Sequence, residues 1–293
     1  MFIFCVIIIL SFGDDVMIMD GKKVSEEIKK EISLKIKDSL CKPCLAVIQI
    51  GEDDASNIYV NSKKRACQEV GVSLKHIKFS NKDSEEQIIH KIKELNNDKY
   101  VHGIIVQLPI DKKYNQYKII NTISENKDVD CLTDKNIAKL YNNDNSLTPC
   151  TPLGIIKLLN YYNITVEGKH VVIVGKSNLV GKPLSILLLN KGATVTICHS
   201  KTNNLKEFTK MADILVVAVG KKYLITSDMV KENSVVIDVG INIDNEKIYG
   251  DVDFENVKDK VLFITPTPGG VGPMTVAMLL NNVLHNFENN KKN

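Results

Sequence analysis

The hydrophobic residues in the first half of the chain follow two alternating patterns. Residues 24–40 carry apolar side chains at helical spacing among lysines and glutamates, which is typical of an amphipathic helix. Residues 45–50 form a short apolar run that ends at a glycine, which suits a strand buried in a parallel sheet. Extended along the chain, these patterns predict helices at 24–40, 54–70 and 84–96 and strands at 45–50, 74–79 and 103–108. Alternating strands and helices indicate βαβ units.

The second half of the chain repeats this alternation with short β-branched runs. These runs predict strands at 171–174, 194–198, 214–219, 234–239 and 261–264. The segment Pro149-Cys150-Thr151-Pro152 separates the two halves, so we place a domain boundary there. We expect a first domain at 17–148, a second domain at 149–280, and a C-terminal helix and tail at 281–293. The final helix, which starts near Met274, is expected to return to the first domain.

The composition is that of a soluble globular protein with a sizeable core. Apolar residues make up 44% of the 293 residues, and charged residues make up 25%. The net charge of +3 arises from 38 basic and 35 acidic residues that are interspersed along the chain, without a basic stripe. Nothing in this distribution favours a nucleic-acid partner.

The seven cysteines indicate reduced thiols rather than a metal site or a disulfide framework. Cys41 and Cys44 have C-x-x-C spacing, but neither a second pair nor paired histidines accompany them. The odd count and the apolar surroundings of most cysteines fit a reducing, cytosol-like compartment. We therefore expect no metal.

The first residues of the chain form an apolar segment with two open interpretations. Residues 1–12 are almost entirely apolar but too short to span a bilayer, so we expect no stable membrane insertion. No basic residues precede the segment, and no secretory cleavage site is evident. Met17 opens a stretch that reads like a normal start, so residues 1–16 are either a targeting segment or a mis-assigned start. We expect a cytoplasmic protein, unless the segment directs it to an organelle or the secretory route.

A glycine-containing segment follows the first strand of the second half. It reads Gly175-x-Ser177-x-x-x-Gly181 and precedes a leucine-rich helix with Pro183 in its first turn. Glycine permits a sharp turn and close backbone approach to a pyrophosphate, and the helix start offers free N–H groups to an anion. The segment departs from the standard G-x-G-x-x-G, so on its own a structural turn explains it equally well. Its place between a strand and a helix favours a Rossmann-type dinucleotide site.

The end of the next strand favours NADP over NAD. An NAD enzyme usually carries a carboxylate there, which binds the ribose 2′-hydroxyl. The chain has no acid at that point and instead has Ser200 and Lys201, with Lys176 on the facing loop. A solvated lysine in a turn would explain Lys201 alone but not the missing acid. Hydroxyl and ammonium donors suit a 2′-phosphate, so the expected cofactor is NADP.

Several polar positions in the first half are candidates for chemistry, although each also has an ordinary structural explanation. Tyr59 and Lys63 are four residues apart, so they share one face of a helix, as any random pair can. Gln107 ends an apolar strand, where ligands bind open α/β sheets or where an amide bonds a neighbouring loop. Asp128 and Asp130 place two carboxylates in a loop, where helix capping is the alternative.

A glycine- and proline-rich loop precedes the last helix. Residues 265–275 include Pro268, Gly269 and Thr275, and a turn needs fewer special residues than this segment has. The loop suits close backbone approach to a flat ring.

Together these motifs resemble, in type and in order, those of the methylenetetrahydrofolate dehydrogenase/cyclohydrolase family. The resemblance extends from about residue 17 to residue 287, nearly the whole chain. It rests on Tyr59-x-x-x-Lys63, Val106-Gln107-Leu108-Pro109, Lys127-Asp128-Val129-Asp130, Pro149-Cys150-Thr151-Pro152, Gly175-x-Ser177-x-x-x-Gly181, Val239-Gly240-Ile241-Asn242 and the 268–275 loop. Each motif alone is modest, but seven in this order are specific.

The resemblance implies two α/β domains with parallel sheets, a cleft between them, and two activities. The enzyme would oxidise 5,10-methylenetetrahydrofolate with NADP and hydrolyse the methenyl product to 10-formyltetrahydrofolate. It would thus serve one-carbon metabolism and purine biosynthesis. Its partners would be tetrahydrofolate substrates and a second copy of the chain in a homodimer.

The resemblance also implies residue roles. Lys63 would be the central cyclohydrolase residue, with Gln107 beside it. Tyr59 would stack on the aromatic part of the folate, and Asp130 would accept hydrogen bonds from the pterin as part of the catalytic set. Pro268 and Gly269 would line the substrate site. The residues expected to bind NADP are Gly175, Lys176, Ser177, Ser200, Ile241 and Thr275.

Two residues depart from the family pattern. Cys131 stands where the family usually has glycine, so the loop would have to differ if that position needs a positive φ. Lys176 replaces a common arginine and keeps its charge but not its bidentate fork.

Two other function classes are less consistent with the chain. Short-chain dehydrogenases also use a Y-x-x-x-K pair, but their pair follows the nucleotide fold, whereas Tyr59 and Lys63 precede the glycine segment. A binding module without catalysis would not need Lys63, Gln107 and Asp130 together. Methenyl hydrolysis without added NADP would separate the family reading from both.

Overall fold

The computed structural model describes residues 16–290 except 53, 145 and 246. In the first half, β2 (Cys44–Ile50) lies between β3 (Ser73–Phe79) and β4 (Gly103–Val106), and both pairings are parallel. Helices α2 (Asp54–Val70) and α3 (Glu85–Asn97) make the crossover connections that parallel strands require. β2 is buried along its whole length, because helices cover both faces of this sheet.

The side chains of this sheet alternate between two cores. Leu45, Val47 and Ile105 face a core shared with α1 (Gly21–Lys37), α2 and α10 (Val271–Asn290). The intervening residues, such as Ile48, face a second core that includes the buried side of α3. This alternation fixes the register, because a shift of one residue would turn every apolar side chain to the wrong face.

The second half contains a larger sheet whose described strands all run parallel. Its strand order is β1 (Met17–Ile18), β11 (Phe263–Ile264), β8 (Val235–Asp238), β7 (Ile214–Val217), β5 (His170–Val174) and β6 (Thr194–Cys198). The order reverses at β5, since β6 pairs on one side of it and β7 on the other. Ligands of open α/β sheets bind outside the carboxyl ends of the strands at such a reversal.

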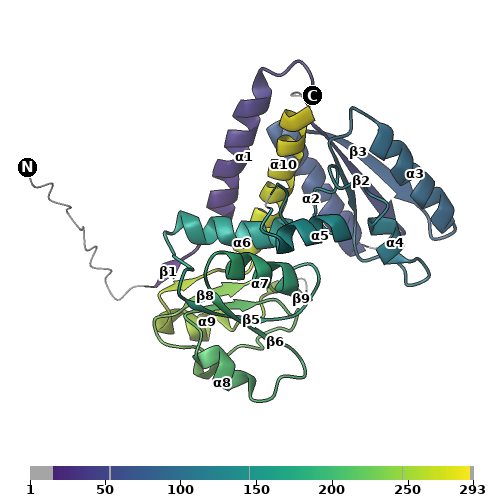
Figure 1. Cartoon of the computed structure of the whole chain (residues 1–293). Coiled ribbons are helices and arrows are strands. Elements are labelled where there is room, and N and C mark those ends of the chain that lie inside the picture. The colour runs from purple at the N-terminus through teal and green to yellow at the C-terminus, as the bar shows by residue number, and fades with distance from the viewer. Residues whose placement is uncertain (1–15, 53, 145, 246, 291–293) are drawn as a thin grey trace, which may run out of the picture.

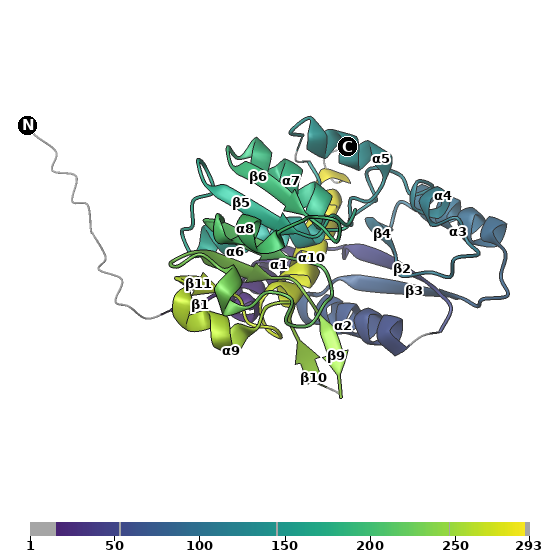
Figure 2. The same cartoon turned by 90° about the horizontal axis from the view of Figure 1, so that it is seen from below.

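Three long helices connect the halves. α10 packs against α1 and against α6 (Cys150–Tyr161), and its far part enters the core of the small sheet (Figure 1). The last helix therefore contributes to the cores of both halves. Seen from below, the two sheets lie on either side of these helices (Figure 2).

The remaining elements are short. They are α4 (Gln116–Ile120), α5 (Asp134–Tyr141), α7 (Gly181–Asn190), α8 (Leu205–Lys210), η1 (Ser227–Met229), β9 (Asn242–Asp244), β10 (Lys247–Tyr249), α9 (Phe254–Val257) and η2 (Lys258–Lys260). β9 and β10 form an antiparallel hairpin that follows β8.

The predicted α/β class with two parallel sheets is confirmed, but the sequence did not predict β1. This strand lies within 17–148, the range assigned to the first domain, yet it pairs with β11 in the second sheet. A strand of two residues has no periodicity to read. Val16 packs partly buried against the same sheet, whereas the rest of the predicted extension, residues 1–15, lies outside the described residues. No helix between residues 16 and 290, so far as described, is long and apolar enough to cross a membrane.

Candidate active site

Lys63 and Gln107 meet at the carboxyl edge of the small sheet. Lys63 lies on α2, and Gln107 directly follows β4. The Lys63 amine donates a hydrogen bond to Gln107 Oε1 over 2.7 Å. The Gln107 amide nitrogen donates to the Leu108 carbonyl over 2.7 Å, which fixes the amide with its oxygen toward Lys63. Residues 44 positions apart in the sequence are thus direct partners.

Asp130 shares this edge. The backbone at Asp128 forms a parallel bridge with Ile104 of β4, so the following residues emerge beside Gln107. Burial raises the pKa of Asp130, and the charge of Lys63 opposes that rise. Burial likewise lowers the pKa of Lys63, and Asp130 opposes that shift. The two groups are close enough to affect each other's proton affinity, and both lack full hydration.

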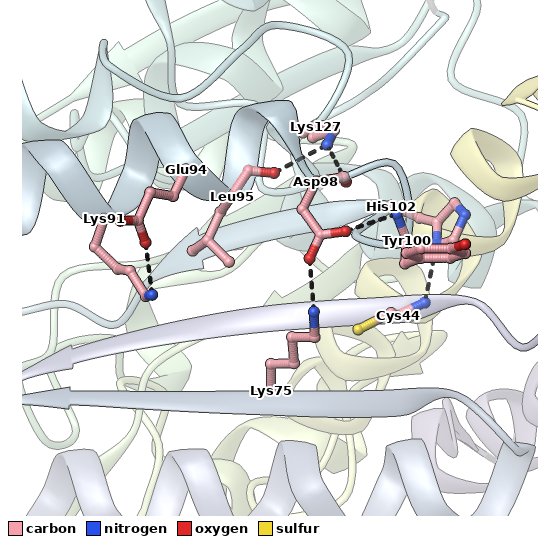
Figure 3. Close-up of polar contacts among 9 residues, drawn as sticks. All are labelled: Cys44, Lys75, Lys91, Glu94, Leu95, Asp98, Tyr100, His102 and Lys127. Atoms are coloured by element: carbon pink, nitrogen blue, oxygen red, sulfur yellow. Dashed lines mark hydrogen bonds and ion pairs between the residues drawn. The ribbon is translucent and has the colours of Figure 1, made fainter.

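The segment before Asp130 is fixed by a buried lysine on the opposite side of the small sheet. Lys127 donates to the Leu95 carbonyl over 2.9 Å and to the Asp98 carbonyl over 2.7 Å, at the end of α3 (Figure 3). A cation suits the carbonyl end of a helix. The Asp98 carboxylate in turn pairs with Lys75 over 2.7 Å. Lys127 therefore anchors the strand-like segment that leads to Asp130.

Asp128 holds the loop that leads into α5, although it is not itself the helix cap that was the alternative for this pair of carboxylates. It is buried and accepts hydrogen bonds from the backbone N–H groups of Leu132 and Thr133 and from the side chain of Asn136. Thr133 is the N-cap of α5. Asp128 thus holds the loop, and Asp130 alone of the two faces the cavity described below.

Cys131 adopts a backbone conformation that favours glycine. Its φ is 57°, in the left-handed region, and its side chain is fully buried. The loop after Asp130 therefore keeps its turn despite the missing glycine.

A cavity of about 440 Å³ lies between the halves and contains the candidate catalytic residues. Its first wall carries Tyr59, Lys63, Gln107 and Asp130, and its second wall comes from loops of the larger sheet and from the start of α10. The residues of the second wall are Leu179, Val180, Val239, Ile241, Val271, Gly272, Thr275, Val276 and Leu279. Most of this lining is apolar, which suits a planar ring with a few directed polar contacts.

The glycine segment forms a tight turn after β5. A side chain at Gly175 would place its Cβ 2.2 Å from the Ala218 carbonyl oxygen, and one at Gly181 would lie 2.0 Å from the Gly175 carbonyl oxygen. Ser177 Oγ accepts hydrogen bonds from the N–H groups of Val180 and Gly181, at 3.1 and 3.4 Å. The segment lies at the strand-order reversal and leads into α7, which is the geometry that cradles a dinucleotide phosphate.

The predicted NADP residues fall into two groups. Ile241 and Thr275 line the cavity beside the catalytic residues. Gly175, Lys176, Ser177 and Ser200 lie outside it, at the carboxyl ends of β5 and β6. Lys176, Ser200 and Lys201 are exposed, and no acid occurs between residues 199 and 204. These residues fit a cofactor with a 2′-phosphate, whose nicotinamide end would reach toward Ile241.

Pro268 and Gly269 line a second cavity of about 400 Å³ that adjoins the first. Tyr59, Ile241 and Val271 contribute to both cavities. The expected substrate residues are therefore divided between two connected spaces, with Tyr59 at their junction.

Sequence reasoning missed several residues that shape the site. Asp251 is fully buried and accepts hydrogen bonds from the N–H groups of Val219, Gly220 and Lys221, which hold the loop after β7. Asn282 of α10 donates to the Val129 and Thr148 carbonyls, both over 2.9 Å. The available signal for Asn282 was a pair of asparagines, Asn281 and Asn282, within an apolar stretch of α10.

Thr151 and Cys150 were quoted only as part of a linker motif, yet both line the cavity. Thr151 shares a 2.9 Å hydrogen bond with Thr275. Burial raises the pKa of Cys150 well above its usual value, so it remains a thiol and donates to the Val129 carbonyl. Among residues 16–290 as described, no group of three or more metal-ligating side chains occurs.

Two family models match the chain. The catalytic-domain model of tetrahydrofolate dehydrogenase/cyclohydrolase matches residues 19–130, and the NAD(P)-binding-domain model of the same family matches residues 149–291.

Curated relatives match over nearly their whole length. The bifunctional protein FolD of Caldanaerobacter subterraneus subsp. tengcongensis is 47% identical over 272 residues, which cover 93% of this chain and 97% of the relative. The protein of the same name from Campylobacter hominis is 49% identical over 280 residues, covering 94% and 98%.

Solved structures match the fold equally well. The bifunctional FolD methylenetetrahydrofolate dehydrogenase/cyclohydrolase of Campylobacter jejuni has a TM-score of 0.92 at 45% identity, covering 94% of this chain and 99% of its own. The methylenetetrahydrofolate dehydrogenase-cyclohydrolase of Trypanosoma brucei, solved with NADP cofactor and inhibitor, has a TM-score of 0.91 at 30% identity, covering 95% and 99%.

Proposed function

Because the chain belongs to the tetrahydrofolate dehydrogenase/cyclohydrolase family, we propose that it oxidises 5,10-methylenetetrahydrofolate with NADP and hydrolyses the methenyl product to 10-formyltetrahydrofolate. The observation that supports this most strongly is the convergence of Lys63, Gln107 and Asp130 on one cavity that the cofactor loops also line. The products place the enzyme in one-carbon metabolism, upstream of purine biosynthesis.

The dehydrogenase step mainly requires that the protein position the substrate against the cofactor. When bound, NADP supplies the acceptor for the hydride that leaves the one-carbon bridge of the substrate. Asp130 faces the cavity and suits the paired N–H donors of the pterin, and Tyr59 offers a ring for the aromatic part of the folate. The mostly apolar walls suit the flat ring system of the substrate, and the product is a delocalised cation. Little acid–base help from the protein is required.

The cyclohydrolase step requires a group that accepts a proton from water. Water adds to the methenyl carbon, one proton leaves the water, and the ring opens to the formyl product. Lys63 lines the cavity and can take that proton. Burial lowers the pKa of Lys63, so a larger fraction of the amine is neutral at physiological pH. Gln107 holds the amine at the cavity wall through the 2.7 Å hydrogen bond. A cationic substrate beside Lys63 would lower the pKa further.

The assignment of the cofactor loops completes the proposal. Gly175, Lys176, Ser177 and Ser200 would hold the phosphate-bearing half of NADP, and Ile241 and Thr275 its nicotinamide half. Pro268 and Gly269 would contact the substrate where it leaves the first cavity. The relative from Trypanosoma brucei, solved with NADP, supports the choice of cofactor.

One experiment tests both activities. Purified protein would be mixed with methylenetetrahydrofolate and NADP, and NADPH and methenyl absorbance followed together. We expect NADPH to form with little methenyl accumulation, and added methenyltetrahydrofolate to be hydrolysed without NADP. Hydrolysis that requires NADP, or no turnover of either substrate, would contradict the proposal.

We also propose a cytoplasmic homodimer. The family resemblance supports the dimer, and the six described cysteines, all free thiols, fit a reducing compartment. Light scattering should give about twice the chain mass of 32.7 kDa. A monomeric mass would refute the dimer, and localisation of a tagged chain to an organelle would refute the compartment.

A further inference from the structure

The second cavity continues the first along one face of α2. Tyr59 belongs to both cavities, whereas Lys63 lines only the first, and Ser62, Arg65, Ala66 and Glu69 line only the second. Residues 59, 62, 66 and 69 recur at helical spacing, so they form a continuous track. Arg65 lies beside this track, three residues after Ser62 and four before Glu69. It is about 9 Å farther along the helix than Tyr59, at 1.5 Å per residue. The opposite wall is the 266–273 loop.

Arg65 is unusual in this chain. It is the only arginine, against 37 lysines among the 38 basic residues. Its side chain is exposed on the cavity wall, and it forms no hydrogen bond or ion pair with any of the described residues. Every other basic position carries lysine, both the exposed ones and the buried Lys127. A planar guanidinium differs from an ammonium in its fork of donors, which matches a carboxylate in two places at once.

The other charges of the second cavity are already matched. Lys29 pairs with Glu69 over 2.6 Å. Asp238 is buried and accepts hydrogen bonds from the backbone N–H groups of Gly240, Asp251 and Val252. Among the described residues that line the second cavity, Arg65 is therefore the charge without a partner, and an anion is the ligand that it fits.

We propose that the second cavity binds the glutamyl tail of the folate substrate, with Arg65 holding one of its carboxylates. This inference rests on the proposed function. With the pterin at Asp130 and Lys63 and the aromatic linker along Tyr59, the acidic end of the substrate leaves the first cavity at its junction with the second. Arg65 stands on that path. The second cavity thus binds the end of the substrate that does not react, so it contributes to substrate affinity and not to the chemical step.

Substrates with and without the tail test the proposal. Methylenetetrahydropteroate lacks glutamate, whereas methylenetetrahydrofolate carries one glutamate. For Arg65→Ala we expect the KM for methylenetetrahydrofolate to rise about tenfold with kcat unchanged, because a charge-assisted contact of this kind is lost. The KM for methylenetetrahydropteroate should stay at the wild-type value. Arg65→Lys should recover part of the loss, and added salt should shrink the difference.

Lys64→Ala is the matched control, because Lys64 is a neighbouring exposed cation on α2 that lines neither cavity. It should change neither substrate's KM. Turnover of both substrates by the wild-type enzyme tests the proposed function on its own. A failure of the proposed function is therefore distinguished from a failure of the tail-binding site. An Arg65→Ala enzyme that keeps its KM for methylenetetrahydrofolate, or loses affinity equally for both substrates, would overturn the tail-binding site.

Discussion

Lys63 and Lys127 are both withdrawn from water, and burial lowers the pKa of each, yet their surroundings differ. The Lys63 amine has a single hydrogen-bond partner among the described residues, Gln107, and faces a cavity at the carboxyl edge of the small sheet. The Lys127 amine has two backbone carbonyl partners on the other side of the sheet and lines neither cavity. A lowered pKa alone therefore does not identify a catalytic lysine. What distinguishes Lys63 is an amine with unused hydrogen-bonding capacity that faces a cavity large enough for a substrate.

Lys63→Met should have the largest effect on catalysis. A general base typically contributes about 10²–10⁴-fold, so we expect cyclohydrolase activity to fall by that order. Dehydrogenase activity and NADP binding should remain measurable, and methenyl intermediate should accumulate. Rates of the two half-reactions, measured separately, check this. Lys64→Met is the control, and near wild-type hydrolysis by Lys63→Met would reduce Lys63 to a helix-surface lysine.

Lys127→Met should instead reduce stability. The carbonyls of Leu95 and Asp98 would each lose a hydrogen bond from a charged donor but would keep one from a backbone N–H, so we expect a loss of about 1–3 kcal/mol. Denaturant unfolding would measure it. Lys63→Met should unfold near the wild-type midpoint, because Lys63 has fewer bonds to lose. If Lys127→Met abolished hydrolysis alone at unchanged stability, the contrast between the two lysines would fail.

Exposed lysines form a third class, which acts through charge. Lys176 and Lys201 are exposed near the expected 2′-phosphate, with no acid in the adjoining turn. A charge-assisted contact contributes about 1.5–3 kcal/mol, so the enzyme should prefer NADP over NAD by roughly tenfold or more. The ratio of kcat/KM for the two cofactors measures this. Equal values would show that the end of β6 has been misread.

The pH dependence of the two activities sharpens the comparison. A lysine that acts as a base must be neutral, and burial shifts the pKa of Lys63 below 10.5. Hydrolysis should therefore rise with pH, by at most about tenfold per unit, until it levels off above that lowered pKa. Dehydrogenase activity should rise much less. Because methenyltetrahydrofolate also hydrolyses spontaneously, the Lys63→Met profile is subtracted. A flat corrected profile would exclude Lys63 as the base.

The sequence predicted many of the longer elements, but it missed the 12-residue helix α6, which begins at the segment interpreted as a domain boundary, and some of the shortest strands. The apolar runs at 45–50 and 171–174 became β2 and β5, while β1 and the β9–β10 hairpin were not predicted, because two or three residues carry no periodicity. The motifs identified Lys63, Gln107 and Asp130 as candidates. Their proximity could not be derived from spacing, since Lys63 meets Gln107 through the packing of α2 at the edge of the small sheet, and the bridge between Ile104 and Asp128 brings Asp130 there.

Lys127 and Arg65 were visible in the sequence but were not recognised as candidates. Lys127 was quoted only within the Lys127-Asp128-Val129-Asp130 motif, because nothing local reveals that its amine reaches the end of α3. Arg65 was the only arginine in the chain, yet the Tyr59 and Lys63 pair drew the interpretation of that helix. In both cases the partner or the cavity is made by segments distant in sequence.

Cys131→Gly should have the smallest effect, and it tests the loop that joins the two lysine environments. Cys131 holds φ at 57°, where a side chain costs about 1–2 kcal/mol relative to glycine. Glycine would relieve that cost but lose a buried thiol, about 1 kcal/mol of burial, and add chain entropy to the unfolded state. We expect Cys131→Gly to unfold within about 1 kcal/mol of the wild type.

Cys131→Ala separates these terms, because it keeps the strained backbone and loses only the thiol. It should be less stable than Cys131→Gly by about 0.5–1 kcal/mol. The KM for methylenetetrahydrofolate should be the same in all three proteins, since Cys131 already gives Asp130 the backbone turn that glycine would give. An alanine variant more stable than the glycine variant would mean that the left-handed turn carries no strain. A lower KM in the glycine variant would mean that Cys131 displaces Asp130 from its best position for the pterin.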